Sequence, residues 1–250
     1  MHIVAVVNQK GGVGKTTTTA NLAHAIARSG RKTAVVDLDP QGHLTAYLGC
    51  AGRNQRGTGD VIGHGADPRA LCIEARERLW LLPAGPALKE VEMSGRLDPQ
   101  NGFTGALKSA FNDQDFVFID CPPASGVLIQ YALSVVDTIL VPVAGDYLAL
   151  RGLSDLIGTL RRYASDHTGT LTQWMVITRF HTRRRLCWEV REKLLEYFPG
   201  QILATAIRET AALAESPSFG KTVFEYRNSD YGAEDYRALA QDFISKRFML

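Results

Sequence analysis

The stretch that decides the fold is Gln9-Lys10-Gly11-Gly12-Val13-Gly14-Lys15-Thr16-Thr17. An ordinary P-loop places Gly-x-x-x-x-Gly-Lys-Ser/Thr after a strand: backbone N–H groups hold the phosphates, the lysine reaches the β and γ oxygens, and the hydroxyl binds Mg²⁺. The rear half of this stretch fits that pattern. Its first position holds Gln9 instead of glycine, and Lys10 follows, which adds a second cation at the front of the loop. We interpret the stretch as a deviant P-loop.

The residues around this loop have the pattern that a phosphate site requires. Ile3 to Val7 is a short β-branched run typical of a buried strand. From Thr16 to Ser29, small and aliphatic residues recur at helical spacing, and Gly30 stands where a helix would end. A glycine loop between a strand and a helix aims free N–H groups and the positive end of the helix dipole at an anion. A glycine turn that merely contains lysines is the weaker interpretation.

Two further apolar runs end in aspartates. Thr33 to Leu38 predicts a strand that leads into Asp37-Leu-Asp39-Pro-Gln-Gly42, and Phe116 to Ile119 predicts one followed by Asp120-Cys-Pro-Pro123. The carboxyl ends of parallel strands line the crevice in which doubly wound sheets bind ligands. The second run has the pattern of a Walker B strand, whose aspartate holds the metal through water. For Asp37, the cap of a turn is an equally good interpretation.

The rest of the chain continues the alternation of strands and helices. Further strands are expected at Leu79 to Leu82, Thr138 to Val143, Trp174 to Ile177 and Ile202 to Ala206, and helices at Leu153 to Arg162, Cys187 to Phe198 and Ala233 to Ile244. This order predicts the α/β class, a doubly wound, mainly parallel sheet with helices on both faces. Residues 51–69 are rich in glycine and predict a surface loop around a short helix near Asp60 to Ile62. A linker between domains is the alternative, but we expect one domain over residues 1–250.

Composition and charge are those of an ordinary globular protein. Apolar residues make up 45% of the chain and charged residues 22%, which excludes a disordered or fibrous class. The net charge of +2 is nearly neutral, so nucleic-acid binding would have to rest on a local patch. Met1 leads directly into a strand, and no apolar run approaches the ~18 residues of a membrane span. We therefore expect no signal peptide, no membrane span and no N-terminal DNA-binding extension.

The cysteines Cys50, Cys72, Cys121 and Cys187 are widely spaced, without a Cys-x-x-Cys pair. A disulfide framework or a metal cluster needs closer or patterned spacing. We expect reduced and mostly packed thiols. This expectation disfavours the iron–sulfur reductases and cluster scaffolds that share such a P-loop.

Five segments, in order along the chain, resemble the ParA/MinD family of deviant Walker ATPases, and most of all its small ParA (Soj-type) branch. They are Lys10 to Thr17, Val36 to Gly42, Ile119 to Pro123, Ala149-Leu-Arg-Gly-Leu153 and the polar loop Ala214-Glu-Ser-Pro-Ser-Phe-Gly-Lys221. The likeness runs from the first strand to about Leu239. It implies a P-loop NTPase fold, an ATPase activity, and ATP and Mg²⁺ as cofactors.

The resemblance implies nucleotide contacts at the matching loop positions. The residues concerned are Lys10, Gly11, Gly12, Val13, Gly14, Lys15, Thr16 and Thr17. Lys15 would bind the β and γ phosphates in its own subunit, and Thr17 would contact the α phosphate. Lys10 resembles the signature lysine that crosses to the partner's nucleotide in an ATP-sandwich dimer. At Thr178-Arg179-Phe180 the chain departs from the family pattern, so no base-recognising side chain is carried over, and ATP over GTP rests on the family alone.

The same resemblance implies a metal site and a hydrolytic residue. Thr16 and Asp120 would belong to the Mg²⁺ site, with Asp37 as a nearby switch carboxylate. Asp39 resembles the residue that positions the attacking water. A loose phosphoryl transition state needs positioned water and added positive charge rather than covalent chemistry, which agrees with this set. Catalysis is therefore expected to rest on Lys10, Lys15 and Asp39.

A basic segment between Arg179 and Lys193 is the candidate for a nucleic-acid contact. Arg183, Arg184 and Arg185 precede a predicted helix, so we expect them on an exposed loop that can reach phosphates without reading bases. From the residues alone, a solvated charged loop is an equally good interpretation. ParA relatives bind DNA non-specifically through basic residues in this region once dimerised, and that implies DNA binding by Arg179 and Arg183 to Arg185. Arg208 is a weaker candidate of the same kind.

The resemblance implies a positioning ATPase of the cytoplasm. Its ATP-bound homodimer would hold nucleoid DNA, and a cognate ParB-like or cargo-adaptor protein would stimulate hydrolysis and release. The cargo, whether plasmid, chromosome or protein assembly, is not encoded in these motifs. A metabolic P-loop enzyme, such as an amide or biotin-pathway ligase, would have little use for Lys10.

A membrane switch like MinD is the chief alternative. Asp242 to Leu250 mixes basic and apolar residues. An interfacial anchor usually needs a separate helix with a distinct apolar face. Here we expect the segment to continue the helix from Ala233 as a frayed end packed by Phe243, without a stable membrane anchor.

Overall fold

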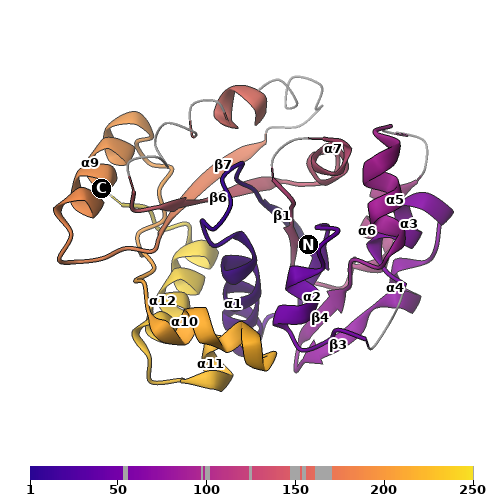
Figure 1. The fold of residues 1–250 in the computed structure, drawn as a ribbon, viewed down its shortest axis with the longest axis horizontal. Coiled ribbons are helices and arrows are strands. Elements are labelled where there is room, and N and C mark those ends of the chain that lie inside the picture. The colour runs from indigo at the N-terminus through magenta and orange to yellow at the C-terminus, as the bar shows by residue number, and fades with distance from the viewer. Residues whose placement is uncertain are drawn as a thin grey trace.

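The computed structural model of the chain describes residues 1–52, 56–96, 98, 102–123, 126–146, 153, 156–160 and 171–249. Its centre is a seven-stranded sheet in the order β3-β4-β2-β5-β1-β6-β7, with helices on both sides (Figure 1). The strands are β1 (His2–Val6), β2 (Thr33–Asp37), β3 (Ile73–Arg76), β4 (Leu79–Leu82), β5 (Phe116–Asp120), β6 (Thr138–Ala144) and β7 (Thr172–Thr178).

Every pair of neighbouring strands is parallel except β3 with β4. This confirms the predicted doubly wound, mainly parallel sheet. The edge strand β3 was not predicted, because its short, half-buried sequence Ile-Glu-Ala-Arg carries little apolar signal. β1 lies between β5 and β6. The strands that follow β1 in the chain, β2 to β5, lie on one side of it, and β6 and β7 lie on the other. Ligands of such sheets bind at this switch point, beyond the carboxyl ends of the strands.

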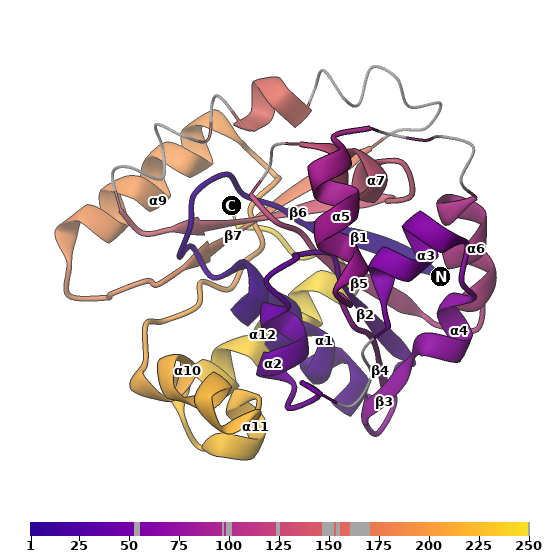
Figure 2. The same ribbon diagram turned by 45° about the vertical axis from the view of Figure 1, so that its right-hand side comes forward.

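Alternating side chains of β1 divide the core into two layers. Ile3 and Ala5 pack with one face and Val4 and Val6 with the other. The helices of the second layer are α1 (Lys15–Arg28), α2 (His43–Tyr47), α10 (Ala211–Glu215), α11 (Val223–Tyr226) and α12 (Tyr231–Ser245). Those of the first are α3 (Thr58–His64), α4 (Pro68–Leu71), α5 (Ala87–Ser94), α6 (Phe103–Ala110), α7 (Val127–Leu133) and α9 (Arg185–Tyr197), and Figure 2 shows the two groups on opposite sides of the sheet.

Most predicted elements are present within a few residues of their expected bounds, and two predictions lie partly outside the described residues. Of the motif from Ala149 to Leu153, only its last residue is described. Of the helix predicted from Leu153 to Arg162, residues 153 and 156–160 are described and helical. The helices α2, α4, α5, α6, α7, α10 and α11 were not predicted.

The strand predicted at Ile202 to Ala206 is wrong. Ile202 makes an isolated bridge to Met175 of β7, and Leu203 makes one to Phe248. The segment covers the edge of β7 through single backbone contacts and forms no continuous ladder. An apolar run alone cannot distinguish such a cover from a strand.

The short helix predicted near Asp60 to Ile62 is present as α3, but its first residues are more buried than a surface loop would allow. α3 is longer than expected, and its residues Thr58 to Ile62 are buried. A Cβ atom on Gly59 would lie 2.0 Å from the backbone nitrogen of Leu88. The glycine is therefore needed for close packing of α3 against α5. Glycine in this region permits a tight contact between two helices, although glycine-rich sequence is typical of loops.

The C-terminal tail also differs from the prediction. α12 ends before it, and the N–H of Met249 donates to the carbonyl of Ile202 at 2.8 Å. Phe248 and Leu203 form an antiparallel bridge. The tail therefore turns back as an extended segment and does not continue the helix. Phe243 packs the end of α12 as expected, with 2% of its surface exposed.

Candidate nucleotide site

The carboxyl ends of β1, β2 and β5 bring the three predicted motifs together. The register places Val6 beside Asp120 on one side of β5 and Asp37 beside Asp120 on the other. The P-loop follows β1 directly and α1 begins at Lys15. Residues far apart in the sequence thus meet at one edge of the sheet, as the predicted topology required.

The loop has the backbone of a phosphate cradle. Gly12 and Gly14 adopt φ of 72° and 88°, a region that residues with a Cβ rarely occupy. No side chain caps the first turn of α1, so its N–H groups remain available to an anion. A Cβ built on Gly11 or Gly12 would meet nothing within 4 Å, which shows open space over the loop. These features fit the phosphates of a nucleotide.

Asp120 is the buried carboxylate of the site. Its Oδ2 accepts a hydrogen bond of 2.7 Å from Thr16, and its Oδ1 accepts one of 3.1 Å from Thr19. Burial raises the pKa of Asp120 to about 7, and the charge of Asp37 adds to this, while the two hydroxyls and Lys15 oppose it. A divalent cation would relieve this cost. A hydroxyl and a carboxylate, completed by phosphate and water oxygens, fit Mg²⁺.

Asp37 holds the segment that follows β2. Its Oδ2 accepts hydrogen bonds from the hydroxyl and the backbone N–H of Thr45 at 2.6 and 2.8 Å, and its Oδ1 accepts one from the N–H of Asp39 at 3.2 Å. Burial raises the pKa of Asp37 to about 6. The side chain thus serves as a turn anchor, the alternative left open by the sequence. Its contribution to a metal site stays a prediction.

Asp39 lies at the mouth of the site and is half-buried. Its Oδ1 accepts a hydrogen bond of 2.9 Å from the N–H of Gln41, and Gly42 follows with φ of 63°. The carboxylate is therefore oriented by its own turn, next to the two buried aspartates. This position is compatible with the predicted role on water.

Lys10 makes an ion pair within its own chain. Its Nζ lies 2.7 Å from Oδ1 and 2.9 Å from Oδ2 of Asp146, which follows β6, and its backbone N–H donates to Asn8 Oδ1 at 3.0 Å. The two charged side chains are 35% and 42% exposed. Sequence reasoning missed Asp146, because a single aspartate after a strand carries no signal until β6 is known to lie beside β1.

A cavity of about 230 Å³ opens beside the loop, between Gly12, Gly14 and Thr17 on one side and residues 207–214 on the other. The segment Ala214 to Lys221, predicted as a polar loop, forms the end of α10 and the 3₁₀ helix η1 (Ser216–Phe219). Ile207, Leu213 and Tyr236 also line this cavity and were not predicted. The sequence pointed to this region through the motif that begins at Ala214 and through Thr178 and Arg179, which also line the cavity.

The arginines predicted to bind DNA fall into two groups. Arg183, Arg184 and Arg185 are exposed at the start of α9. Arg184 lies 3.7 Å from Glu209, and Arg185 lies 2.8 Å from Glu189. Exposed pairs of this kind contribute about 0–1 kcal/mol, so these side chains remain accessible to another anion.

The remaining two arginines lie closer to the nucleotide site. Arg179 is 2.9 Å from Glu209 and lines the cavity beside Gly12. Arg208 forms a two-pronged contact with Asp235 at 2.6 to 3.1 Å, and these hydrogen bonds raise the pKa of its guanidinium. Arg208 is 31% exposed and held by Asp235 and Glu234, so it is a weaker candidate for a DNA contact than the α9 arginines. Arg179 is 54% exposed, and its pair with Glu209 is as open to solvent as that of Arg184 with the same carboxylate.

All four cysteines are free thiols, and Cys50, Cys121 and Cys187 are buried, in line with the predicted packing. The described residues contain no cluster of three or more histidine, cysteine or acidic side chains suited to a metal ion. Within the same residues, no helix combines the length and the apolar character needed to cross a bilayer.

Comparison with known proteins assigns the family. Residues 1–172 match the AAA_31 family, described as an AAA domain. The sporulation initiation inhibitor protein Soj of Bacillus subtilis (strain 168) is 35% identical over 245 residues, which cover 96% of this chain and 97% of the relative. The chromosome partitioning protein ParA of Myxococcus xanthus (strain DK1622) is 34% identical over 250 residues, covering 98% of this chain and 88% of the relative.

Solved structures share the fold over nearly the whole chain. A crystal structure described as cobyrinic acid a,c-diamide synthase from Mycobacterium smegmatis, with a bound ATP analogue and magnesium, has a TM-score of 0.84 at 29% identity and covers 100% of this chain and 98% of its own. MinD of Pyrococcus horikoshii, complexed with Mg-ADP, has a TM-score of 0.76 at 23% identity, covers 97% and 95%, and supports the fold alone. The chain belongs to the Soj/ParA family of chromosome-partitioning ATPases, an ATP-binding P-loop family.

The buried aspartates predict a pH-dependent stability in the absence of Mg²⁺ and nucleotide. Because the folded-state pKa values of Asp120 and Asp37, about 7 and about 6, exceed the ordinary value of 3.8, the folded chain binds protons more tightly than the unfolded chain. Their stabilising contribution is present below about pH 4 and is lost as pH rises through 6 to 7. The free energy of unfolding in urea should fall across this range in the wild type, and less so in Asp120→Asn. Glu192→Gln, an exposed change, should follow the wild type, and an Asp120→Asn profile parallel to it would contradict the assignment.

Proposed function

We propose that this chain is a ParA-type positioning ATPase, which binds ATP and Mg²⁺, forms a sandwich dimer, and hydrolyses ATP when a partner protein stimulates it. The observation that carries the proposal is the division of labour between the two loop lysines. Lys15 begins α1 and acts on the electrostatics of Asp120, whereas Lys10 leaves the loop toward Asp146 and is a third exposed. A lysine in that position is available to a nucleotide held by a second subunit.

In this proposal the chain's residues bind the phosphates and the metal and orient the attacking water. Mg²⁺, when bound, offsets the charge on the transferred phosphoryl group. Lys15 and the N–H groups of the first α1 turn hold phosphate oxygens, and Thr16 and Asp120 would hold the metal. Asp39 accepts a hydrogen bond from the attacking water and aligns it. The cavity between Thr17 and residues 207–214 takes the base and the ribose.

Lys10 can leave Asp146 for the nucleotide of a second subunit at little cost in free energy. An exposed ion pair in water contributes only about 0–1 kcal/mol. The two charges of the Lys10–Asp146 pair are about 35–42% exposed, so the pair can open when a triphosphate with a larger negative charge approaches. A lysine supplied by the second subunit makes hydrolysis conditional on dimerisation, which suits a timer better than a metabolic catalyst.

In this proposal the dimer binds DNA. Three adjacent exposed arginines at the start of α9 supply charge that can contact phosphates of any sequence. The Trp188 indole donates to the carbonyl of Thr182 at 2.8 Å, and the N–H of Arg184 donates to the carbonyl of His181 at 2.9 Å. These bonds order the segment that carries the arginines, which lowers the entropy cost of binding.

The partner would be a ParB-like or cargo-adaptor protein, and the site of action the nucleoid in the cytoplasm. A MinD-like membrane switch is disfavoured by the tail. Phe248 and Met249, the apolar residues that an interfacial anchor would expose, are half-buried and paired with the 202–203 segment. An anchor would have to break these contacts before its apolar face could meet lipid.

Nucleotide binding should depend on Lys15. Lys15→Ala removes a charged hydrogen-bond donor to the phosphates, which corresponds to a loss of about 100-fold in affinity. Isothermal titration with a non-hydrolysable ATP analogue and Mg²⁺ measures it. Lys108→Ala, an exposed lysine on α6 outside the site, is the control and should bind as the wild type does. Equal affinity of Lys15→Ala and wild type would rule out the P-loop assignment.

The proposed roles of Asp39 and Lys10 predict opposite effects on the dimer. Asp39→Ala should bind ATP, lose hydrolysis and accumulate as a dimer, because the water is no longer aligned. Lys10→Ala should bind ATP but lose hydrolysis and much of the dimer. Light scattering with ATP and Mg²⁺, together with phosphate release, distinguishes them. An Asp39→Ala protein that stays monomeric, or a Lys10→Ala protein that hydrolyses ATP normally, would contradict the respective role.

DNA binding should follow the salt law of phosphate contacts. With ATP, the dimer should retard unrelated duplexes equally, and log affinity should fall linearly with log salt at ~0.9 per contact. Replacing Arg183, Arg184 and Arg185 by alanine should reduce the slope of log affinity against log salt by about 2 to 3 for each subunit that contacts the DNA. ATP binding should stay intact. Exposed charges elsewhere provide the matched triple Arg31→Ala, Lys32→Ala and Lys108→Ala, which should keep the slope.

The same assay discriminates DNA from membrane. Wild-type protein with ATP should not sediment with anionic liposomes. If it sediments with them and ignores DNA, the MinD-like alternative replaces the partition proposal.

A further inference from the structure

Trp188, in the first turn of α9, is a large apolar side chain at the surface and is 43% exposed. Figure 2 shows α9 along the outer edge of the molecule, together with the segment that precedes it. The indole N–H of Trp188 donates to the carbonyl of Thr182 at 2.8 Å, so the ring lies against the segment that carries Arg183 and Arg184. The tryptophan therefore belongs to the same surface as the arginines proposed to contact DNA.

The ring of Trp188 is held in place on more than one side. Phe180, which is buried, meets it edge-on at a ring-centroid distance of 5.1 Å. The guanidinium of Arg191 lies 5.9 Å from the ring centroid, within reach of a cation–π contact. A side chain that is already fixed loses little rotamer entropy when it binds a partner. An exposed ring of this kind is suited to contact another molecule.

Positive charge flanks the ring. The arginines at residues 183–185 lie on one side, and Arg191 lies over the ring. Arg183 makes no ion pair with any residue that the structure describes, and the pairs of Arg184 and Arg185 are exposed. A partner that meets this surface should carry closely spaced anions with apolar groups between them. DNA has this chemistry, because its sugars and base edges lie between its phosphates.

A lipid surface fits these residues less well. Leu186 is also exposed at the start of α9, but two residues along a helix turn the side chain by about 200°. Leu186 and Trp188 therefore point to opposite flanks of α9 and form no continuous apolar face, which an interfacial helix needs. Glu192 and Glu196 are exposed farther along the same helix and would repel anionic headgroups.

We propose that Trp188 packs against the sugars and base edges of DNA, between phosphates contacted by Arg183 to Arg185, and adds an apolar part to the affinity. This inference rests on the DNA binding proposed above. Phosphate contacts weaken as salt rises, because they act through counterion release. Burial of apolar surface releases no counterions, so the share of Trp188 is the same at every salt concentration. It would also be the same for every DNA sequence.

A salt series tests the contact on the full chain, with a non-hydrolysable ATP analogue and Mg²⁺ and a fluorescently labelled duplex of arbitrary sequence. Trp188→Ala should bind about tenfold more weakly than the wild type at each salt concentration, with an unchanged slope of log affinity against log salt. Trp188→Phe keeps a ring but loses the N–H, and should stay within about threefold of the wild type. Tyr197→Ala, a change at a 61% exposed aromatic at the far end of α9, is the matched control and should bind as the wild type does.

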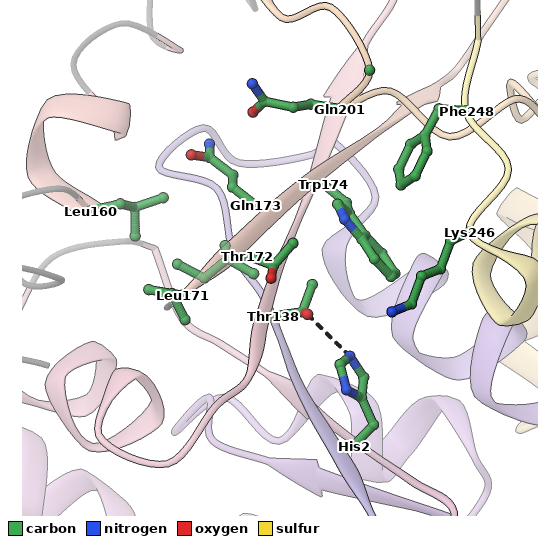
Figure 3. A pocket seen from close by; sticks show the side chains of 12 residues that line it. His2, Thr138, Leu160, Leu171, Thr172, Gln173, Trp174, Gln201, Lys246 and Phe248 are labelled. Carbon is green, nitrogen blue, oxygen red and sulfur yellow. Dashed lines mark hydrogen bonds between the residues drawn. The ribbon is translucent and has the colours of Figure 1, made fainter. Parts of the chain in front are cut away.

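Tryptophan fluorescence gives a second readout. Of the three tryptophans, Trp80 lies in β4, near the sheet edge opposite β7, and Trp174 is 6% exposed. Figure 3 shows Trp174 beside Phe248 in the wall of a cavity at the amino ends of β6 and β7, where DNA bound at α9 would not reach its ring. DNA should therefore quench the emission of the wild type and leave that of Trp188→Phe nearly unchanged.

Several outcomes would overturn the inference and leave DNA binding by the arginines intact. They are wild-type affinity in Trp188→Ala, a reduced salt slope in Trp188→Ala, and a Trp188→Phe protein as weak as Trp188→Ala. The last two would make Trp188 a positioning residue for the arginines through Thr182. Sedimentation with phosphatidylglycerol vesicles that is lost in Trp188→Ala would assign the ring to lipid instead. A wild type that binds no duplex would overturn both this inference and the proposed function. Circular dichroism and nucleotide binding of Trp188→Ala show whether the variant is folded.

Discussion

The hydrogen bonds from Thr16 and Thr19 to Asp120 are the interaction on which the site depends. They join the first turns of α1 to the end of β5 at 2.7 and 3.1 Å, and both Thr19 and Asp120 are buried. Burial beside Asp37 makes the ionised form of Asp120 unfavourable in free energy, and the two hydroxyls offset only part of that cost. The position of the phosphate cradle is thereby tied to a group that favours either a proton or a cation.

A buried polar network extends from α1 toward the rest of its layer. Asn21 donates to the hydroxyl of Tyr47 at 2.8 Å and accepts the N–H of Val223 at 2.9 Å, and the Tyr47 hydroxyl lies 3.3 Å from Ser216. Fully paired buried networks specify a unique packing, because a shifted arrangement leaves polar groups unsatisfied. The network therefore fixes how α1, α2, η1 and the start of α11 pack against one another. Such contacts are a physical route for coupling between these elements.

The sequence predicted the fold class, the nucleotide motifs and most central strands because each of these has a local physical signature. A phosphate cradle needs glycines at positive φ, and a buried parallel strand needs a continuous apolar run. The errors have a different origin. Gly59 packs α3 against α5, and the 202–206 segment covers a strand edge, so both depend on neighbours distant in the chain. The partner of Lys10 was missed for the same reason, since Asp146 becomes its neighbour only through the order of β1 and β6.

In the proposed dimer Lys10 is a switch residue, and the weak contact that holds it suits this role. A buried, fully hydrogen-bonded pair would cost several kcal/mol to break, and a subunit interface would have to supply that energy before gaining any contact. An unpaired lysine would carry its full side-chain entropy into the interface. The half-exposed pair with Asp146 lies between these limits: it restricts the lysine near the mouth of the site and releases it for about 1 kcal/mol or less. In the proposed dimer, the phosphates of the second subunit then compete with a single carboxylate, and the outcome depends on whether the γ phosphate is present.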